Sequence, residues 1–320
     1  MKFLTKITAL VLCAYLLPAV AFARELIPVG QVVGLELRDN SVTVAGLEED
    51  TAQKTKAADL AVGDRIIAID GRKIRSAGDV REALQRSDGT VTISVQRNGK
   101  NREYSLIPQI TSDGPKLGLY LRQGVTGIGT VTYYDPATKA FGTLGHGVND
   151  SKGQLLALKS GCAYRARVIS VRKGLSGEPG QLMGTIESKA PIGELTKNTQ
   201  QGVFGVSDKG WGGEAIEIAA TDTIKTGDAT ILSTVSGDTV REYSVEILKI
   251  YPKSRTNGRN MLLKVTDPAL LSTTGGIVQG MSGSPIIQNG KLVGAVTHVL
   301  VNDPTTGYGI FIENMLDAAA

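Results

Sequence analysis

One serine has flanking residues suited to nucleophilic catalysis. Ser282 lies in the run Gly280-Met281-Ser282-Gly283-Ser284-Pro285. A serine nucleophile needs a general base and preorganised N–H donors for the oxyanion that forms on the substrate. The glycines allow a tight turn that directs the amides of Gly280 and Ser282 at one point. The run predicts a nucleophile with its own oxyanion hole, although a simple Gly/Ser turn between strands would have the same spelling.

The sequence contains two histidines that can serve as the base. His146 lies in Thr143-Leu144-Gly145-His146-Gly147, before Ser282, and His298 follows Ser282 on or after a predicted strand. In one arrangement of the serine–histidine–aspartate triad, the histidine comes first in the chain and the serine last. His146 fits that order. His298 is interpreted either as a packed residue or as part of the substrate pocket, where its ring would donate to a polar or amide side chain.

The acid that would orient the base is not determined by spacing. The aspartates between His146 and Ser282 are Asp150, Asp208, Asp222, Asp228, Asp238 and Asp267. Composition and order alone leave all of them open.

Other chemistries have little support. Two histidines, with Cys162 the sole cysteine after residue 23, are too few for a histidine/cysteine metal site. Cys162 is predicted to be a small buried apolar residue, because no motif supplies it with a base. The net charge of +4 comes from well-mixed acids and bases and does not favour nucleic acid. We therefore expect no metal, no cofactor and no nucleic-acid partner.

The first 23 residues predict export. Lys2 and Lys6 precede an apolar stretch over residues 7–20, and Ala21-Phe22-Ala23 has the small-x-small pattern of a cleavage site. We interpret 1–23 as a secretory signal, with an uncleaved N-terminal membrane anchor as the alternative. Both interpretations place the remainder outside the cytoplasm, either secreted or membrane-tethered.

Residues 27–110 are predicted to form one α+β unit. The run Val62-Gly63-Asp64-Arg65-Ile66-Ile67-Ala68-Ile69-Asp70-Gly71 indicates a turn, a strand and a tight Asp-Gly turn. A helix is expected through 79–85, and a strand over 90–96 precedes the hairpin signal Asn98-Gly99.

This order of elements resembles a PDZ domain, through the run 62–71 and the helix start Ala77-Gly78-Asp79-Val80. PDZ domains bind an extended peptide as an added strand, and a loop of backbone N–H groups holds its C-terminal carboxylate. By chain order that loop is predicted at residues Val29, Gly30, Gln31, Val32, Val33 and Gly34, which lack the usual Gly-Leu-Gly-Phe spelling. The expected ligand is a peptide or a segment of the chain itself. A module that only positions the next domain is the alternative.

Residues 111–116 are predicted to be a linker, and 116–320 a second, mainly β domain. Short apolar stretches separated by Gly, Asn-Gly and Asp-Pro predict strands over 117–121, 128–134, 140–144, 229–234, 243–251, 261–265, 286–287, 292–297 and 309–312. An all-β barrel or a pair of barrels accounts for this pattern best.

Two long runs resemble the stage IV sporulation protein B peptidases. One extends from Gly127 through His146 to Gly147, and the other from Thr274 through Ser282 and His298 to Glu313. The resemblance implies a chymotrypsin-like double β-barrel preceded by the PDZ domain. It also implies a catalytic triad of His146, Ser282 and Asp267, the last in Lys264-Val265-Thr266-Asp267-Pro268.

The same resemblance implies a serine endopeptidase of spore formation. Such a protease is exported from the forespore into the space between the two membranes and trims its own N-terminal region. In the space between the membranes it cleaves a regulator of an intramembrane protease, and this cleavage triggers activation of a late sigma factor. Two alternatives remain at this stage: a PDZ-containing quality-control protease, and a catalytically inert PDZ binding protein.

Overall fold

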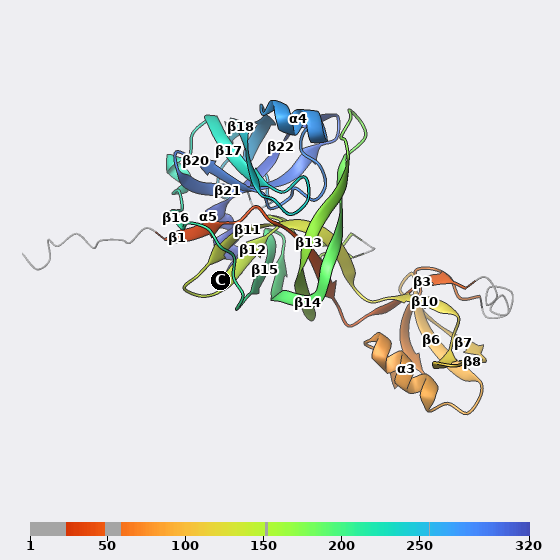
Figure 1. The fold of residues 1–320 in the computed structure, drawn as a ribbon. Helices are drawn as coiled ribbons and strands as arrows, with labels where there is room; N and C mark the ends of the chain where they lie inside the picture. Colours follow the sequence, from red (N-terminus) through yellow and green to blue (C-terminus); the bar gives the residue numbers. More distant parts are fainter. Residues whose placement is uncertain (1–23, 49–58, 151–152, 256) are drawn as a thin grey trace, which may run out of the picture.

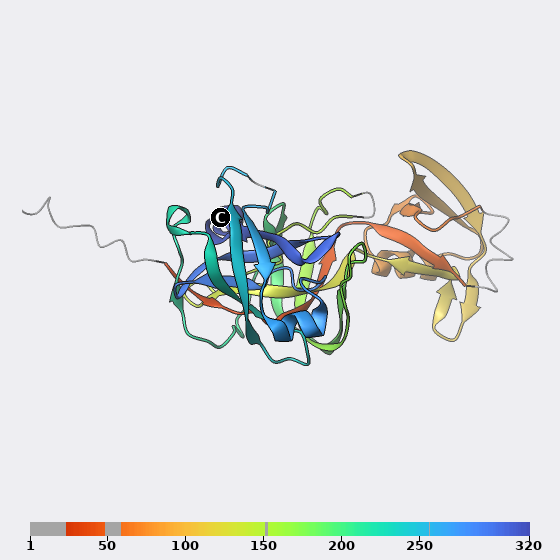
Figure 2. The ribbon, with the colours of Figure 1, turned by 90° about the horizontal axis from the view of Figure 1, so that it is seen from above.

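The computed structural model describes residues 24–48, 59–150, 153–255 and 257–320. The predicted signal or anchor at 1–23 lies outside these residues. Two β-barrels pack against each other, and a smaller α+β unit extends from the first of them (Figures 1 and 2). Within the described ranges, no helix is long and apolar enough to cross a membrane.

The first barrel is built from an eight-stranded sheet, in the order β12-β15-β14-β13-β2-β11-β1-β16, which closes through a further pairing of β11 with β12. Buried Leu35, Val131, Phe141 and Ala163 fill its interior. The strands are β1 (Glu25–Pro28), β2 (Val32–Arg38), β11 (Val125–Asp135), β12 (Ala140–Thr143), β13 (Ser160–Arg172), β14 (Gln181–Thr199), β15 (Gly202–Val206) and β16 (Ile216–Glu217).

The second barrel closes completely, in the order β17-β18-β19-β22-β21-β20. Alternate residues Ala229, Ile231 and Ser233 of β17 are buried, as expected for a strand with one face inward. The strands are β17 (Gly227–Ser233), β18 (Arg241–Ile250), β19 (Met261–Val265), β20 (Pro285–Gln288), β21 (Lys291–Leu300) and β22 (Asp303–Phe311). A 3-10 turn, η1 (Thr221–Thr223), precedes the barrel, α4 (Pro268–Thr274) follows β19, and α5 (Ile312–Ala319) follows β22.

The α+β unit has a sheet in the order β10-β3-β4-β6-β7, with β5 paired to β4. Its helix α3 (Ala77–Gln85) begins at Ser76 with a capping box formed with Asp79, and packs Val80 and Leu84 inward. The strands are β3 (Val42–Leu47), β4 (Arg65–Ile69), β5 (Arg72–Lys73), β6 (Val91–Arg97), β7 (Lys100–Leu106) and β10 (Leu119–Arg122). The predicted mainly β fold, with two barrels and a PDZ-like unit, is confirmed.

The connectivity differs from the predicted succession of two domains. β2 pairs with β11 and β13, so residues 27–38 belong to the first barrel rather than to the PDZ-like unit. The chain leaves the barrel after β2, forms the unit from Val42 to Arg122, and returns directly into β11. The unit is thus inserted into the barrel. A short apolar strand such as β2 carries no local signal of which sheet it will join.

The predicted linker at 111–116 is a small hairpin. β8 (Gln109–Thr111) pairs with β9 (Gly114–Lys116). The next strand, predicted to open the protease domain, is β10, which pairs with β3 of the PDZ-like unit.

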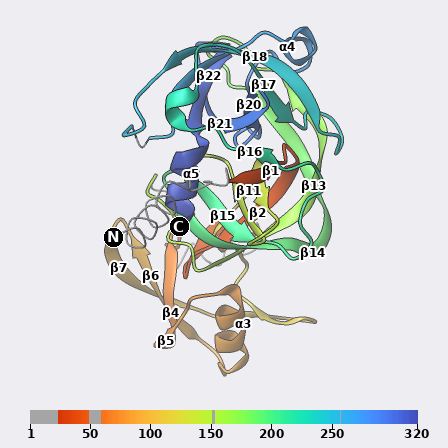
Figure 3. The same ribbon diagram turned by 90° about the vertical axis from the view of Figure 1, so that its left-hand side faces the viewer.

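The hairpin of β13 and β14 joins the two barrels. It rises beside the second barrel in Figures 1 and 3, and its tip donates from the Gly174 amide to the carbonyl of Thr274 at the end of α4 (2.8 Å). The amide of Gly177 donates to the carbonyl of Val301 (2.9 Å). The hairpin therefore fastens the first barrel to two segments of the second.

Candidate active site

His146, Ser282 and His298 line one cleft between the barrels, with a volume of about 420 Å³. Apolar side chains of β2 and β11 form its wall on the first barrel. Residues 277–280, Ser282 and residues 297–299 form the wall on the second. The structure therefore brings His146 into the same cleft as Ser282 and His298, which lie far from it in the sequence.

Ser282 occupies a tight turn whose glycine is required. The amide of Ser284 donates to the carbonyl of Met281 (2.9 Å), which closes the turn. Gly283 has φ +98°, the left-handed region that the third residue of a type II turn needs. A Cβ on Gly283 would lie 2.0 Å from the carbonyl oxygen of Thr130. The turn thus depends on Gly283, as the residue pattern predicts.

The Ser282 hydroxyl donates to the carbonyl of Thr297 (2.7 Å). In this structure its proton is directed at a backbone oxygen and not at a histidine. A rotation about the Cα–Cβ bond is therefore needed before a base can accept that proton.

His146 is held as a neutral base. Leu144 (φ +68°) and Gly145 (φ +67°) are both left-handed and turn the chain from β12 into the cleft. The His146 Nδ1 lies 2.9 Å from the carbonyl oxygen of Gly147. Because a carbonyl can only accept, Nδ1 carries the proton and Nε2 keeps a free lone pair. Burial lowers the pKa of His146 below 6.5, and the hydrogen bond to Gly147 partly opposes that shift.

The amides of Gly280 and Ser282 are free to bind an oxyanion. In a trans peptide the C=O and N–H groups point in opposite directions. The carbonyl of Gln279 accepts from the amide of Leu182 (2.8 Å), so the Gly280 N–H of the same peptide points away from Leu182. The carbonyl of Met281 accepts from the amide of Ser284, so the Ser282 N–H of that peptide likewise points away from Ser284. Neither amide donates to another group within the described part of the chain.

His298 lies beside His146, with 5.2 Å between the ring centroids. Burial, and then the nearby charges of His146 and Arg259, lower the pKa of His298 to about 4. Its Nδ1 atom is buried without a hydrogen-bond partner in the structure. His298 is thus a neutral polar ring in the cleft, as the substrate-pocket interpretation expects.

Asp267 does not line this cleft. Its carboxylate caps the N-terminus of α4, where it accepts from the amides of Leu270 (2.8 Å) and Ser244 (3.4 Å). The pair Asp267-Pro268 is a common spelling for a helix start, with the aspartate at the N-cap and the proline at N1. Among the described residues, no carboxylate lines the cleft, and the Gly147 carbonyl is the group that orients His146.

The predicted carboxylate-binding loop is wrong. Val29 to Gly34 lie between and within β1 and β2 of the first barrel. The amides of Val29 and Gly30 donate to the carbonyls of Thr132 and Val131 on β11 (3.0 and 2.9 Å). These amides serve the barrel sheet and cannot receive a peptide carboxylate.

A groove on the PDZ-like unit lies instead between α3 and β10. Val80 and Leu84 of the helix face Leu119 and Leu121 of the strand across a space of about 600 Å³. The loop before β10 reads Lys116-Leu117-Gly118-Leu119, and Gly118 has φ +65°. This x-apolar-Gly-apolar spelling is the signal for such a loop, and it contradicts the prediction that residues 117–121 form a strand of the second domain.

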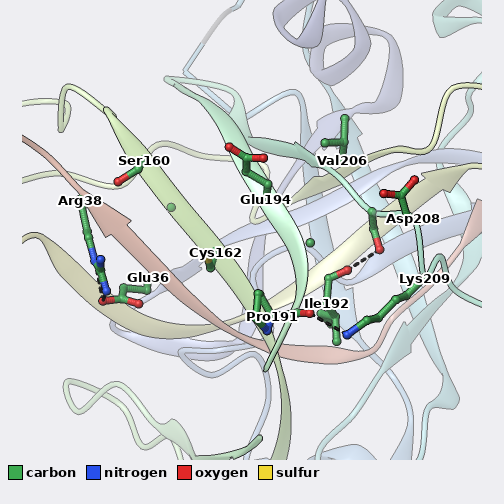
Figure 4. A pocket seen from close by; sticks show the side chains of 13 residues that line it. Glu36, Arg38, Ser160, Cys162, Pro191, Ile192, Glu194, Val206, Asp208 and Lys209 are labelled. Carbon is green, nitrogen blue, oxygen red and sulfur yellow. Dashed lines mark hydrogen bonds and ion pairs between the residues drawn. The ribbon is translucent and has the colours of Figure 1, made fainter. Parts of the chain in front are cut away.

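A second pocket lies on the outer face of the first barrel (Figure 4). Glu36, Cys162 and Glu194 project into it from neighbouring strands, alternating with inward-facing residues such as Leu35. Cys162 is half-buried rather than fully buried. None of the described residues that line this pocket is a histidine, so Cys162 has no adjacent base there. In the described residues, no group of three or more His, Cys, Asp or Glu side chains is placed to hold a metal ion.

Two closed barrels with a nucleophile, a neutral base and paired free amides in their cleft define a serine peptidase. The chain belongs to the SpoIVB peptidase S55 family, whose model matches residues 113–316. A PDZ domain model matches residues 32–107. The protein is therefore a PDZ-containing serine peptidase. In the structure, β2 belongs to the barrel and β10 to the PDZ domain, which adjusts both boundaries.

Curated relatives match over short stretches. "Putative zinc metalloprotease Atu1380" of Agrobacterium fabrum is 35% identical over 88 residues, 27% of this chain and 23% of that protein. A "putative zinc metalloprotease" of Helicobacter pylori is 35% identical over 69 residues, 22% of this chain and 19% of that protein. The chain thus spans about a quarter or less of the length of these relatives.

The solved structures that match parts of this chain do so with low TM-scores. The PDZ domain of an SdrC-like protein from Listeria monocytogenes is 24% identical, covering 26% of this chain and 87% of that one, with a TM-score of 0.22. The inactive form of the Rv3671c protease of M. tuberculosis is 15% identical, covering 61% of this chain and 82% of that one, with a TM-score of 0.35.

Proposed function

We propose that this peptidase is the exported signalling protease of spore formation. In this role it acts in the space between the forespore membranes and cleaves a regulator of an intramembrane protease, which triggers activation of a late sigma factor. Membership of the SpoIVB peptidase family is the observation that carries the proposal.

The cleft supports a two-stage acyl transfer. After rotating away from the Thr297 carbonyl, the Ser282 oxygen attacks the scissile carbonyl and gives its proton to Nε2 of His146. The amides of Gly280 and Ser282 hold the oxyanion. His146 then protonates the leaving amine, and water hydrolyses the acyl-enzyme by the same route.

Asp267 is proposed as the acid on the family resemblance alone. Its hydrogen bonds give it a capping role that would have to be exchanged for a contact with His146. Substituting Asp267 with other residues that can cap a helix separates these two roles.

His298 is proposed to select the substrate. Its unpartnered Nδ1 would be satisfied by a polar or amide side chain of the substrate bound in the cleft. Profiling a peptide library against the wild type and His298→Ala tests this proposal. An unchanged preference would discard it.

The PDZ groove is proposed to bind the C-terminal end of a protein at the membrane, such as the regulator itself. Its apolar walls suit apolar side chains at alternate positions of an added strand. The groove is also lined by Arg81, whose charge would attract a C-terminal carboxylate, and by Lys116, which pairs with Asp113 (2.9 Å).

N-terminal sequencing of the exported protein beside its Ser282→Ala form tests the proposed function. We expect a shorter N-terminus in the wild type than in Ser282→Ala, and a single cut when the wild type meets the membrane regulator. Broad digestion of unfolded proteins, with no self-cleavage, would instead indicate a quality-control protease.

A further inference from the structure

Thr130 connects the first barrel to the turn that carries the nucleophile. It lies on β11, is fully buried and is not among the residues that line the cleft. Its amide donates to the carbonyl of Ser282 (3.0 Å), and its hydroxyl donates to the carbonyl of Gly280 (2.8 Å). One residue of the first barrel thus bonds, through its amide and its hydroxyl, to both residues whose amides form the oxyanion hole.

The carbonyl of Thr130 connects this residue to the segment that carries the base, His146. It accepts from the hydroxyl of Thr143 (2.6 Å) and from the amide of Leu144 (3.3 Å). Thr143 immediately precedes the left-handed turn into His146, and Leu144 is the first residue of that turn. Thr130 therefore fixes the nucleophile segment relative to the base segment, although the two belong to different barrels.

Gly280 is the point at which this connection matters most. Its φ is +100°, and with no Cβ the peptide planes on either side of it rotate more freely than at any other residue type. Leu182 holds the plane before Gly280 through the Gln279 carbonyl. The plane after it is held by the Thr130 hydroxyl on the carbonyl side and by the Met281 amide, which donates to Val278 (3.1 Å).

We propose that Thr130 is a positioning residue for the oxyanion hole. Its hydroxyl fixes the peptide after Gly280, and its amide fixes the carbonyl of Ser282. These two bonds lie on either side of the peptide that carries the Ser282 N–H, and so keep that N–H directed into the cleft. It acts through Gly280 and Ser282 and does not touch the substrate. The inference rests on the assignment of Ser282 as the nucleophile.

The test is Thr130→Val, which preserves shape and removes the donor. Losing one oxyanion donor outright costs about 100- to 1000-fold in kcat, so loosening one should cost about 10- to 100-fold. KM should stay within about two-fold, and Thr130→Ser should restore most of the rate. If Thr130→Val does not fold, Thr130→Ala carries the same expectation.

Thr132 provides a matched control on the same strand. It is also fully buried, but its hydroxyl has no hydrogen-bond partner in the structure. Thr132→Val makes the same chemical change without breaking a bond, and we expect it to leave kcat unchanged.

A transition-state analogue separates positioning from general loss of structure. We expect a peptide boronate, which becomes tetrahedral on Ser282, to bind Thr130→Val more weakly by about the factor lost in kcat. The matching product peptide should bind equally to the variant and the wild type, and the melting temperature should not account for the loss.

A folded Thr130→Val with the kcat and boronate affinity of Thr132→Val would overturn the inference. Failure of the underlying assignment would look different, because Ser282→Ala would then retain activity whatever residue 130 is.

Discussion

At the residue scale, the base is oriented by a backbone carbonyl. The Gly147 oxygen fixes the His146 tautomer, and burial keeps the ring neutral near pH 7. A backbone oxygen holds the ring in place, but it stabilises the imidazolium less than a carboxylate would. The identity of the acid is therefore the main chemical question about this cleft.

The pH dependence of kcat/KM follows from the direction of the His146 shift. Protonated His146 cannot accept the serine proton, so activity falls as the pH drops through its pKa. Because burial lowers this pKa, we expect the midpoint of the acid limb to lie below 6.5. His298, with a pKa of about 4, stays neutral across that range. A midpoint above 6.5 in initial-rate measurements would contradict this account of the base.

Substitutions at Asp267 separate an acid from a cap. Asn and Ser are good N-caps, so Asp267→Asn and Asp267→Ser preserve α4 and remove the charge, whereas Asp267→Ala also removes the cap at a cost of about 1 kcal/mol. If the aspartate serves the triad, all three variants lose most of kcat. If it is only a cap, Asn and Ser keep the wild-type rate, and only Ala unfolds at lower denaturant.

At the element scale, the β13–β14 hairpin shapes the site without contributing a reacting group. Gln279 donates to the carbonyl of Gly180 (2.9 Å) and accepts from Leu182, so the hairpin pairs with the segment directly before Gly280. Its tip is fastened to α4 and to the turn after β21. The first barrel therefore holds the oxyanion segment of the second.

Gly180→Ala tests the hairpin. A Cβ there would lie 2.4 Å from the amide nitrogen of Gly174 and 2.5 Å from a Val278 methyl group. We expect the hairpin to shift and kcat to fall at least ten-fold, which corresponds to a rise of about 1.4 kcal/mol in the activation free energy. Gly212→Ala, where a Cβ meets nothing within 4 Å, is the control. Equal activity of the two variants would show that the hairpin does not hold the site.

The PDZ groove makes its own prediction. Val80 faces the space between α3 and β10, so Val80→Glu should place a charge where an apolar peptide side chain would pack. We expect fluorescence polarisation to show binding of an apolar peptide with a free C-terminal carboxylate, and its loss in Val80→Glu. Cleavage of a short peptide in the other cleft should persist. Undiminished peptide binding by a folded Val80→Glu would place the ligand elsewhere.

At the scale of the whole molecule, the PDZ domain is built into the peptidase. The chain leaves the first barrel at the end of β2, forms the PDZ domain, and re-enters the barrel at β11. Both β2 and β11 line the cleft. Gln123 and Gly124 alone separate β10 from β11. Any rigid displacement of the PDZ domain would thus act directly on strands that line the cleft.

The sequence predicts the site better than the connectivity. The Gly-x-Ser-Gly turn is a local pattern, and with only two histidines in the sequence and the chain order of the triad it predicts Ser282 and His146 as nucleophile and base. Chain order predicts a PDZ loop at residues 29–34, whereas residues 32–38 form β2, whose pairing with β11 and β13 is a long-range choice that the local pattern does not show. Asp267 shows the same limit, because a helix cap and a catalytic acid have the same spelling.

Labelling with a fluorophosphonate probe tests the central claim most directly. The probe forms a covalent bond with an activated serine, and mass spectrometry of the digested protein locates it. We expect one adduct, on Ser282, absent in Ser282→Ala and strongly reduced in His146→Ala. It should persist in Ser284→Ala, since that neighbouring hydroxyl is buried and bonded to Ser233. A folded wild type that stays unlabelled, or carries the adduct on another serine, would contradict Ser282 as the nucleophile.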